Sequence, residues 1–297
     1  MIYDLIIIGM GISGISAAIY AKRSNLNVLI LDKSAPGGLL NNIERIDNYP
    51  GYKSISGPDL AMNLFNQLNE LDVEKKYEEV TEIIDNKELK TVVTSKGKYQ
   101  TKRILIASGR SQRTLGLEHE KELLGHGIST CALCDANFFK DKNVVVVGGG
   151  NSALTEALYL SRIVKKIYLL HRRDVFTAQE EIIEKVKNTS NIEILYKTSI
   201  KELLSSNNML DGVILNDDRK LDVEGLFIYI GFTPKADFIK NLNITNENGY
   251  INVDKNMESD IKGIYAAGDI INKKIYQLVT GASEGATAAV NIINSLK

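Results

Sequence analysis

The sequence predicts an α/β protein in which one structural unit occurs twice. Two segments align without gaps: YDLIIIGMGISG, which ends at Gly14, and KNVVVVGGGNSA, which ends at Ala153. The same shift of 139 residues carries the apolar run VLILD (28–32) onto IYLLH (167–171). Each copy has the pattern of a buried strand, a glycine turn, a helix rich in small and aliphatic residues, and a second strand, which is a βαβ unit.

The glycines of the two copies have one mechanical explanation. In G-x-G-x-x-G/A the first glycine permits a tight turn, the second lets the backbone approach a pyrophosphate, and the third position lets helix and strand pack closely. One such motif is weak evidence, because any glycine turn between a strand and a helix can imitate it. Two copies in matching context favour dinucleotide binding, at Gly9, Gly11 and Gly14 in the first copy and at Gly148, Gly150 and Ala153 in the second.

The end of the second strand in each copy indicates which nucleotide it binds. The first copy has Asp32 there, and an acid accepts hydrogen bonds from a ribose diol, as in FAD or NAD(H). The second copy has His171 followed by Arg172 and Arg173. Guanidinium groups pair with phosphate, so this copy is predicted to bind NADP(H). The alternative is that HRRD is a solvated turn in which Asp174 is the partner of an arginine.

Three further strands are expected, two of which end at glycine and would close their own nucleotide-binding halves. RILIASGR (103–110) belongs to the first half and GLFIYIGFTP (225–234) to the second. GIYAAGD (263–269) is followed by the helix-like stretch ASEGATAAVNIINSL, without a glycine fingerprint of its own. The simplest topology returns this C-terminal piece to the first domain, so that the second domain is an insertion.

The predicted domains are therefore one discontinuous domain and one inserted domain. The first domain comprises residues 1–112 and 239–297, and the inserted domain comprises residues 113–238. The joints between them are expected to be short, near Ser111–Leu115 and near Thr233–Asp237.

Composition excludes several other classes of protein. Apolar residues make up 44% of the 297 residues and charged residues 25%, which is typical of a globular chain. The net charge of −1 argues against nucleic acid as the main partner, because phosphate binding needs a basic excess. No apolar run approaches the ~18 residues of a membrane span, and the N-terminus has no secretion signal. We therefore expect a cytoplasmic protein.

Cys131 and Cys134 are the only cysteines, and they stand three residues apart just before the second βαβ unit. The spacing permits an exchangeable disulfide with a short loop. Half of a zinc site is one alternative, but His119 and His126 would have to supply the other ligands. Two buried, reduced cysteines are another alternative. Asp135, next to Cys134, is a charged residue that could protonate a leaving thiolate.

Taken together, these segments resemble the low-molecular-weight thioredoxin reductases, which are NADPH-dependent FAD flavoproteins of bacterial type. The resemblance runs over essentially the whole chain, through GMGISG, PGG, DNYPG, CALCD, GGGNSA, HRRD, IGFTP, and GIYAAGD with a following TGASEGATAA. CALCD beside a second nucleotide fingerprint is the specific part. The resemblance implies two Rossmann-like dinucleotide-binding domains of three-layer ββα type, with the NADPH domain inserted into the FAD domain.

The resemblance also implies roles for individual residues. Cys134 would face the flavin and receive its electrons, Cys131 would attack the substrate disulfide, and Asp135 would serve as general acid and base. The FAD site would comprise Gly9, Gly11, Ser13, Gly14, Asp32, Lys33, Gly38, Asn48, Asp269 and Gln277. The NADPH site would comprise Gly148, Gly150, Asn151, Ser152, Ala153, His171, Arg172 and Arg173.

Three positions depart from the pattern of these proteins. Thr177 replaces a third arginine, which weakens the expected preference for NADPH, and Leu39 and Tyr276 replace a glutamine and an arginine near the flavin. The expected reaction passes electrons from NADPH through FAD and the two cysteines to oxidised thioredoxin or a thioredoxin-like protein, in a homodimer. Alternatives are a ferredoxin-dependent flavin thioredoxin reductase, a flavin-dependent dithiol oxidase and a nucleotide-binding redox sensor without turnover.

Overall fold

The computed structural model describes residues 1–43 and 46–297, apart from the side chains of residues 42, 133 and 134. The chain divides into two compact units, each described here by itself. The first unit comprises Met1–Ser111 and Thr233–Lys297, and the second comprises Gln112–Phe232.

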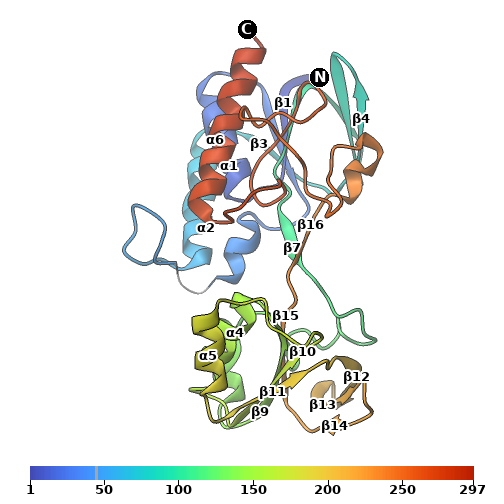
Figure 1. The fold of residues 1–297 in the computed structure, drawn as a ribbon. Coiled ribbons are helices and arrows are strands. Elements are labelled where there is room, and N and C mark those ends of the chain that lie inside the picture. The colour runs from blue at the N-terminus through green and yellow to red at the C-terminus, as the bar shows by residue number, and fades with distance from the viewer. Residues whose placement is uncertain (44–45) are drawn as a thin grey trace. The chain divides into compact units, whose positions relative to one another are not determined.

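The first unit contains a mixed sheet with helices on one face (Figure 1). Its strands are β1 (Ile2–Ile8), β2 (Val28–Asp32), β3 (Glu74–Tyr77), β4 (Val80–Asn86), β5 (Leu89–Thr94), β6 (Lys98–Ile106), β7 (Arg110–Gln112), β16 (Phe232–Pro234) and β17 (Ile264–Ala266), of which β7 and β16 cross the unit boundary. Its helices are α1 (Ile12–Arg23), η1 (Gly38–Asn42), α2 (Gly57–Glu70), η3 (Asp237–Leu242) and α6 (Leu278–Ser295).

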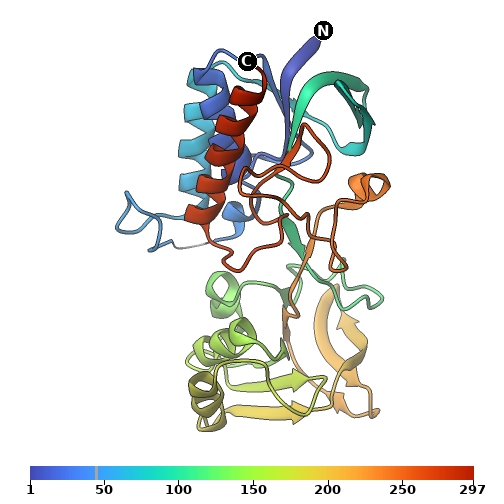
Figure 2. The same cartoon turned by 45° about the horizontal axis from the view of Figure 1, so that its top comes forward.

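The parallel part of this sheet has the order β3-β2-β1-β6, and β17 pairs in parallel with the C-terminal end of β6. The N-terminal half of β6 pairs instead with β5 in an antiparallel ladder that continues to β4. Helices α1, α2 and α6 lie together on one side of the sheet in both views (Figures 1 and 2). The antiparallel strands cover the opposite side, which confirms the predicted three-layer ββα arrangement.

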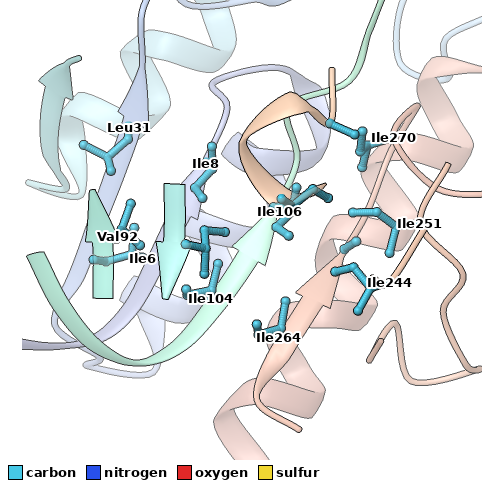
Figure 3. Packing of buried hydrophobic residues seen from close by; sticks show 14 of the residues in the cluster. Ile6, Ile8, Leu31, Val92, Ile104, Ile106, Ile244, Ile251, Ile264 and Ile270 are labelled. Carbon is cyan, nitrogen blue, oxygen red and sulfur yellow. The ribbon is translucent and has the colours of Figure 1, made fainter. Parts of the chain in front are cut away.

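The alternation of side chains along β1 accounts for the two cores of this unit. Leu5 and Ile7 point into a cluster with α1 and α6, whereas Ile6 and Ile8 point into a second cluster on the other face. The second cluster gathers isoleucines from β1, β6, β17 and the C-terminal segments (Figure 3). A strand that is apolar on both faces is what a sheet buried on both sides requires.

The second unit contains a parallel sheet of order β11-β10-β9-β15-β8 and a separate antiparallel sheet of order β12-β13-β14. Helices α4 and α5 lie on one side of the parallel sheet and the antiparallel strands on the other (Figure 2). Its elements are β8 (Ile128–Ser129), α3 (Ala132–Asp135), η2 (Ala136–Phe139), β9 (Asn143–Gly148), α4 (Asn151–Leu160), β10 (Lys166–His171), α5 (Glu180–Lys187), β11 (Ile192–Tyr196), β12 (Ile200–Ser206), β13 (Met209–Leu215), β14 (Lys220–Leu221) and β15 (Gly225–Tyr229).

The predicted duplication is present as two strand–loop–helix–strand units. Gly11 and Gly150 are the N-cap residues of α1 and α4, so the two glycine loops enter their helices at equivalent positions. In both units the strand before the loop pairs in parallel with the strand after the helix. None of the described helices combines the length and the apolar character needed to cross a bilayer.

The two connecting segments, β7 and β16, pair with each other. The second unit ends at Phe232, whereas the sequence placed the boundary at 238. The reason for the difference is packing, because Ala236 is buried in the isoleucine-rich core of the first unit and Phe238 packs against that core. This segment is short and partly polar, so the sequence did not indicate that it would be buried.

Candidate active site: two dinucleotide loops and a disulfide

The first glycine loop is closely packed except at one position. A Cβ at Gly9, whose φ is +112°, would lie 2.3 Å from the carbonyl oxygen of Ala107, and a Cβ at Gly14 would lie 1.9 Å from the Gly9 oxygen. A Cβ at Gly11 would meet no atom within 4 Å. Gly9 and Gly14 are therefore required by the packing of strand and helix, whereas Gly11 leaves a backbone surface that a phosphate can approach.

Asp32 at the end of β2 is held by the loop that it faces. Its Oδ2 accepts a hydrogen bond from the Met10 N–H at 2.8 Å, and its Oδ1 accepts one from the Ser34 N–H at 2.9 Å. Each carboxylate oxygen retains a free lone pair, which suits a ribose diol. Lys33 points to solvent and forms an ion pair with Glu79 at 2.7 Å.

Other residues expected at the flavin are brought together in this unit. A Cβ at Gly38, whose φ is +56°, would lie 3.7 Å from Gly11 Cα, so the PGG turn borders the glycine loop. Asn48 Nδ2 donates to Gln277 Oε1 at 3.1 Å, although the two residues are 229 apart in the chain. Leu39 is one of the exposed large apolar side chains.

Ser13 has a packing role that the sequence did not reveal. Its side chain is buried, and a Cβ at Gly268 or Gly281 would lie 2.4 or 2.9 Å from its Oγ. A Cβ at Gly285 would lie 2.1 Å from the Ser13 carbonyl oxygen. Ser13 is thus the point at which α1 approaches α6 closely, and the glycines of TGASEGATAA permit that approach.

Asp269 is surrounded by cationic side chains that the sequence analysis did not single out. Arg110 Nε lies 3.2 Å from Asp269 Oδ2, and Lys273 Nζ lies 3.6 Å from Oδ1. Lys273 also pairs with Glu284 at 2.7 Å, and burial raises the pKa of Glu284 while Lys273 opposes the rise. The Arg110 guanidinium stacks over the Tyr276 ring at 4.1 Å. Arg110 is the residue directly after the glycine at which the predicted strand ends. That position was the only indication in the sequence that it contributes to the site.

The His171 ring packs against the second glycine loop. A Cβ at Gly149 would lie 2.1 Å from His171 Cε1, and the His171 Nε2 lies 2.8 Å from the Val175 carbonyl oxygen. His171 is buried, whereas Arg172 and Arg173 beyond it are exposed. The imidazole therefore supports the loop, and the two guanidiniums are the groups that a solvent-facing phosphate can reach.

Thr177 also contacts this loop directly. Its N–H and its Oγ1 both donate to the Gly149 carbonyl oxygen, at 2.8 and 3.2 Å. Asn151 Oδ1, at the start of α4, accepts a hydrogen bond from the Gln179 N–H at 2.8 Å. Ala153 packs against Gly148, where a Cβ would lie 2.5 Å from the Ala153 methyl group, and Ser152 is exposed.

The redox motif lies at the N-terminus of the short helix α3, in the second unit. Cys131 is disulfide-bonded, and Cys134 is the only other cysteine of the chain. Ser129 Oγ donates to Asp135 Oδ2 at 2.6 Å and accepts a hydrogen bond from the Cys131 N–H at 3.0 Å. Ser129 is 4% exposed, so it is a buried link between the disulfide and the carboxylate.

A second contact fixes the same turn from another strand. The Ala132 N–H donates to the Tyr229 Oη at 2.8 Å, and Tyr229 ends β15. Gln112 Nε2 donates to the Thr130 carbonyl oxygen at 3.2 Å. None of Ser129, Tyr229 and Gln112 was singled out by the sequence, because single hydroxyl and amide side chains carry no motif.

The two histidines that a zinc site would need have other partners. His119 Nδ1 lies 2.8 Å from Glu122 Oε2, and His126 Nδ1 lies 3.4 Å from the Leu124 carbonyl oxygen. Among the side chains that the structure describes, which do not include that of Cys134, no three histidine, cysteine or acidic groups are placed so that they could hold a metal ion.

Comparison with known proteins assigns the chain to a family. A model described as pyridine nucleotide-disulphide oxidoreductase matches residues 3–286. The chain belongs to this family. Within it, the thioredoxin reductase of Bacillus subtilis strain 168 is 40% identical over 296 residues, which cover 98% of this chain and 94% of the relative.

Solved structures of the family agree with this assignment. The thioredoxin reductase of Lactococcus lactis, in its FR conformation, has a TM-score of 0.84 and 37% identity, and 98% of each chain is covered. The thioredoxin reductase of T. acidophilum has a TM-score of 0.82 and 31% identity over 100% of this chain and 99% of the other. The resemblance on which the sequence analysis relied is thereby confirmed.

Proposed function

We propose that the protein is a thioredoxin-disulfide reductase that passes electrons from NADPH, through FAD and the Cys131–Cys134 disulfide, to oxidised thioredoxin. One observation carries the proposal: a disulfide-bonded Cys131 lies in a turn in which the buried Ser129 donates a hydrogen bond to the partly exposed Asp135. Relatives that match nearly the whole chain are named thioredoxin reductases, and they support the same activity.

The residues of the first unit fit a flavin dinucleotide. The open backbone at Gly11, the adjacent Gly38 and the free lone pairs of Asp32 would hold the pyrophosphate and the adenosine ribose. Asp269, Asn48 and Gln277 would hold the remainder, and Arg110 and Lys273 contribute positive charge there. When bound, the flavin would supply two-electron transfer between a nicotinamide and a disulfide.

The protein residues then carry out thiol–disulfide exchange. The Cys131 thiolate attacks one sulfur of the thioredoxin disulfide, so that a mixed disulfide forms and a thioredoxin thiolate leaves. Asp135, oriented by Ser129, donates a proton to the leaving thiolate. The Cys134 thiolate next attacks Cys131, which restores the enzyme disulfide and releases thioredoxin with two thiols.

The second unit provides the site for NADPH in this proposal. The loop of Gly148, Gly150 and Ala153, together with the exposed Asn151 and Ser152, would hold the pyrophosphate. Arg172 and Arg173 are exposed beyond the buried His171, and they would pair with the 2′-phosphate. In this proposal FAD binds to the discontinuous unit and NADPH binds to the inserted unit.

Replacing both arginines should remove most of the preference for NADPH. A charge-assisted hydrogen bond contributes about 1.5–3 kcal/mol, so Arg172→Ala with Arg173→Ala is expected to lower kcat/KM for NADPH by at least ~10²-fold. The value for NADH should change little, because NADH has no 2′-phosphate. Steady-state kinetics with both nucleotides measure the ratio. Arg162→Ala, an exposed arginine just beyond the C-terminus of α4, is the matched control.

Adding a third guanidinium should have the opposite effect. Thr177 is exposed, and its hydroxyl donates its hydrogen bond to the Gly149 carbonyl oxygen. The hydroxyl proton is therefore not available to a phosphate. Thr177→Arg keeps the backbone bond to Gly149 and is expected to lower KM for NADPH about tenfold, with little change for NADH. An equal change for the two nucleotides would show that position 177 does not face the 2′-phosphate.

The activity is tested by oxidation of NADPH that depends on added oxidised thioredoxin, with the appearance of two thioredoxin thiols per NADPH. Thioredoxin reduction by reduced ferredoxin but not by NADPH would favour the ferredoxin-dependent reaction, and oxygen consumption with a small dithiol would favour an oxidase. A cytoplasmic homodimer is part of the proposal, and light scattering during gel filtration tests the oligomeric state.

A further inference from the structure

The redox turn, residues 129–135, is held in place through a backbone N–H that has no acceptor within its own helix. Ala132 is the first residue of α3, and the N–H groups in the first turn of a helix lack intrahelical acceptors. The Ala132 N–H donates instead to the Tyr229 Oη at 2.8 Å, and Ala132 is fully buried. Water cannot easily replace this acceptor, so the hydroxyl is the group that satisfies the amide.

Tyr229 is itself fixed by the centre of the parallel sheet. It is the last residue of β15, where it is paired with Gly148 of β9, and its ring packs against the apolar cluster that includes Ala132 and Ala136. The hydroxyl position therefore follows from the strand register. It links the glycine loop of the second unit to the start of α3.

Glu156 on α4 completes this chain of contacts. Its Oε2 is buried, and no described residue forms a hydrogen bond with that atom. Burial raises the pKa of Glu156, and the neighbouring Tyr229 hydroxyl opposes the rise. Because the Ala132 N–H supplies the proton of its own bond to Tyr229, the hydroxyl proton is free to point toward Glu156.

We propose that Tyr229 and Glu156 are positioning residues that stabilise the disulfide form of the redox turn. Glu156 orients the Tyr229 hydroxyl, the hydroxyl holds the Ala132 amide, and that amide directly follows Cys131. The proposal rests on the reductase function inferred above, because it assigns these residues to the redox turn of that enzyme. Neither residue touches the substrate in this role.

The direction of the expected effect follows from the proposed stabilisation of the disulfide form. The bond between Ala132 and Tyr229 exists in the form in which Cys131 is disulfide-bonded. Removing the hydroxyl leaves a buried amide without an acceptor in that form, so the disulfide should become easier to reduce. Reduction by dithiothreitol breaks the bond at Cys131, takes two electrons and two protons from the reagent, and leaves two enzyme thiols and cyclic oxidised dithiothreitol.

Tyr229→Phe is the first test, because it keeps the ring in the apolar cluster and removes only the hydroxyl. The full-length protein is equilibrated in dithiothreitol redox buffers, and the fraction of dithiol is read by alkylation and mass spectrometry. We expect the equilibrium constant to shift about three- to tenfold toward the dithiol, which is ~15–30 mV. Tyr159→Phe, on α4 against the same cluster, should leave the equilibrium unchanged.

Glu156 variants test the second contact. Glu156→Ala should shift the equilibrium in the same direction, whereas Glu156→Gln, which retains an acceptor for the hydroxyl, should restore it toward the wild-type value. Adding Glu156→Ala to Tyr229→Phe should have little further effect, because in the proposal both act through the Tyr229 hydroxyl. Glu184→Ala, exposed on α5, is the control.

Equal dithiol equilibria in wild type, Tyr229→Phe and Glu156→Ala would overturn the proposal, and so would a change only in melting temperature. Neither nucleotide nor thioredoxin enters this measurement. Failure of the reductase function, seen as no thioredoxin reduction by wild type, is therefore distinguishable from failure of the positioning role.

Discussion

Cys134→Ser is expected to abolish thioredoxin reduction while leaving the bound flavin reducible by NADPH. Entry of electrons would need the flavin and the nucleotide site of the second unit, whereas their exit needs both sulfurs, because a single thiol can form a mixed disulfide but cannot resolve it. Rapid-mixing spectra in the flavin band should show NADPH-dependent bleaching in the variant at a rate close to wild type. Steady-state assays should show no thioredoxin turnover above background.

The variant carries its own control. Ferricyanide accepts electrons from a reduced flavin without a disulfide, so NADPH-dependent ferricyanide reduction should persist in Cys134→Ser. Loss of both activities would indicate a damaged protein and would call for the flavin content to be compared. Turnover of thioredoxin in a variant that retains its flavin would contradict the dithiol mechanism.

Asp135→Asn is expected to slow thioredoxin reduction by about 10²- to 10⁴-fold, the usual range for a general acid or base. Asn keeps an oxygen that accepts the Ser129 hydroxyl bond, so the turn should keep its shape while the exchangeable proton is lost. The rate of flavin reduction by NADPH should not change. The measurement is kcat for thioredoxin reduction by wild type and by the variant, each with its flavin content determined.

Two further variants define the origin of that effect. Asp141→Asn changes an exposed aspartate at a φ of +61°, a conformation that asparagine also adopts, and should have no effect. Ser129→Ala removes the donor that orients Asp135 and should slow turnover about tenfold, an effect between that of the control and that of Asp135→Asn. If Asp135→Asn matches wild type, Asp135 has only a structural role in the turn.

The fold could be predicted from the sequence because its strongest signals are local and repeated. The βαβ pattern fixes strand order and handedness once a parallel sheet is assumed, and the repeat at a shift of 139 residues gave that pattern twice. The predicted boundary at 238 differs from the unit boundary at Phe232, because Ala236 and Phe238 pack into a core formed by strands distant in sequence.

The residues of the candidate site also fall into two groups, those that the sequence located and those that it did not. Motifs located the glycine loops, Asp32 and the cysteine pair, because each has a fixed spacing. The sequence did not locate Ser129, Tyr229 or Glu156, whose importance comes from burial and from contacts set by strand register. It also assigned Ser13 and His171 to cofactor contacts, whereas the structure shows both side chains packed against glycines of the protein itself. Their roles toward a cofactor stay predictions.

The reductase function is tested by anaerobic titration of the flavin-loaded protein with NADPH, followed by addition of oxidised thioredoxin. We expect NADPH to bleach the flavin band and oxidised thioredoxin to restore it, with two thioredoxin thiols formed for each NADPH consumed. A flavin band that neither NADPH nor NADH bleaches, in a protein that reduces thioredoxin with reduced ferredoxin, would contradict the assigned electron donor and the role of Arg172 and Arg173.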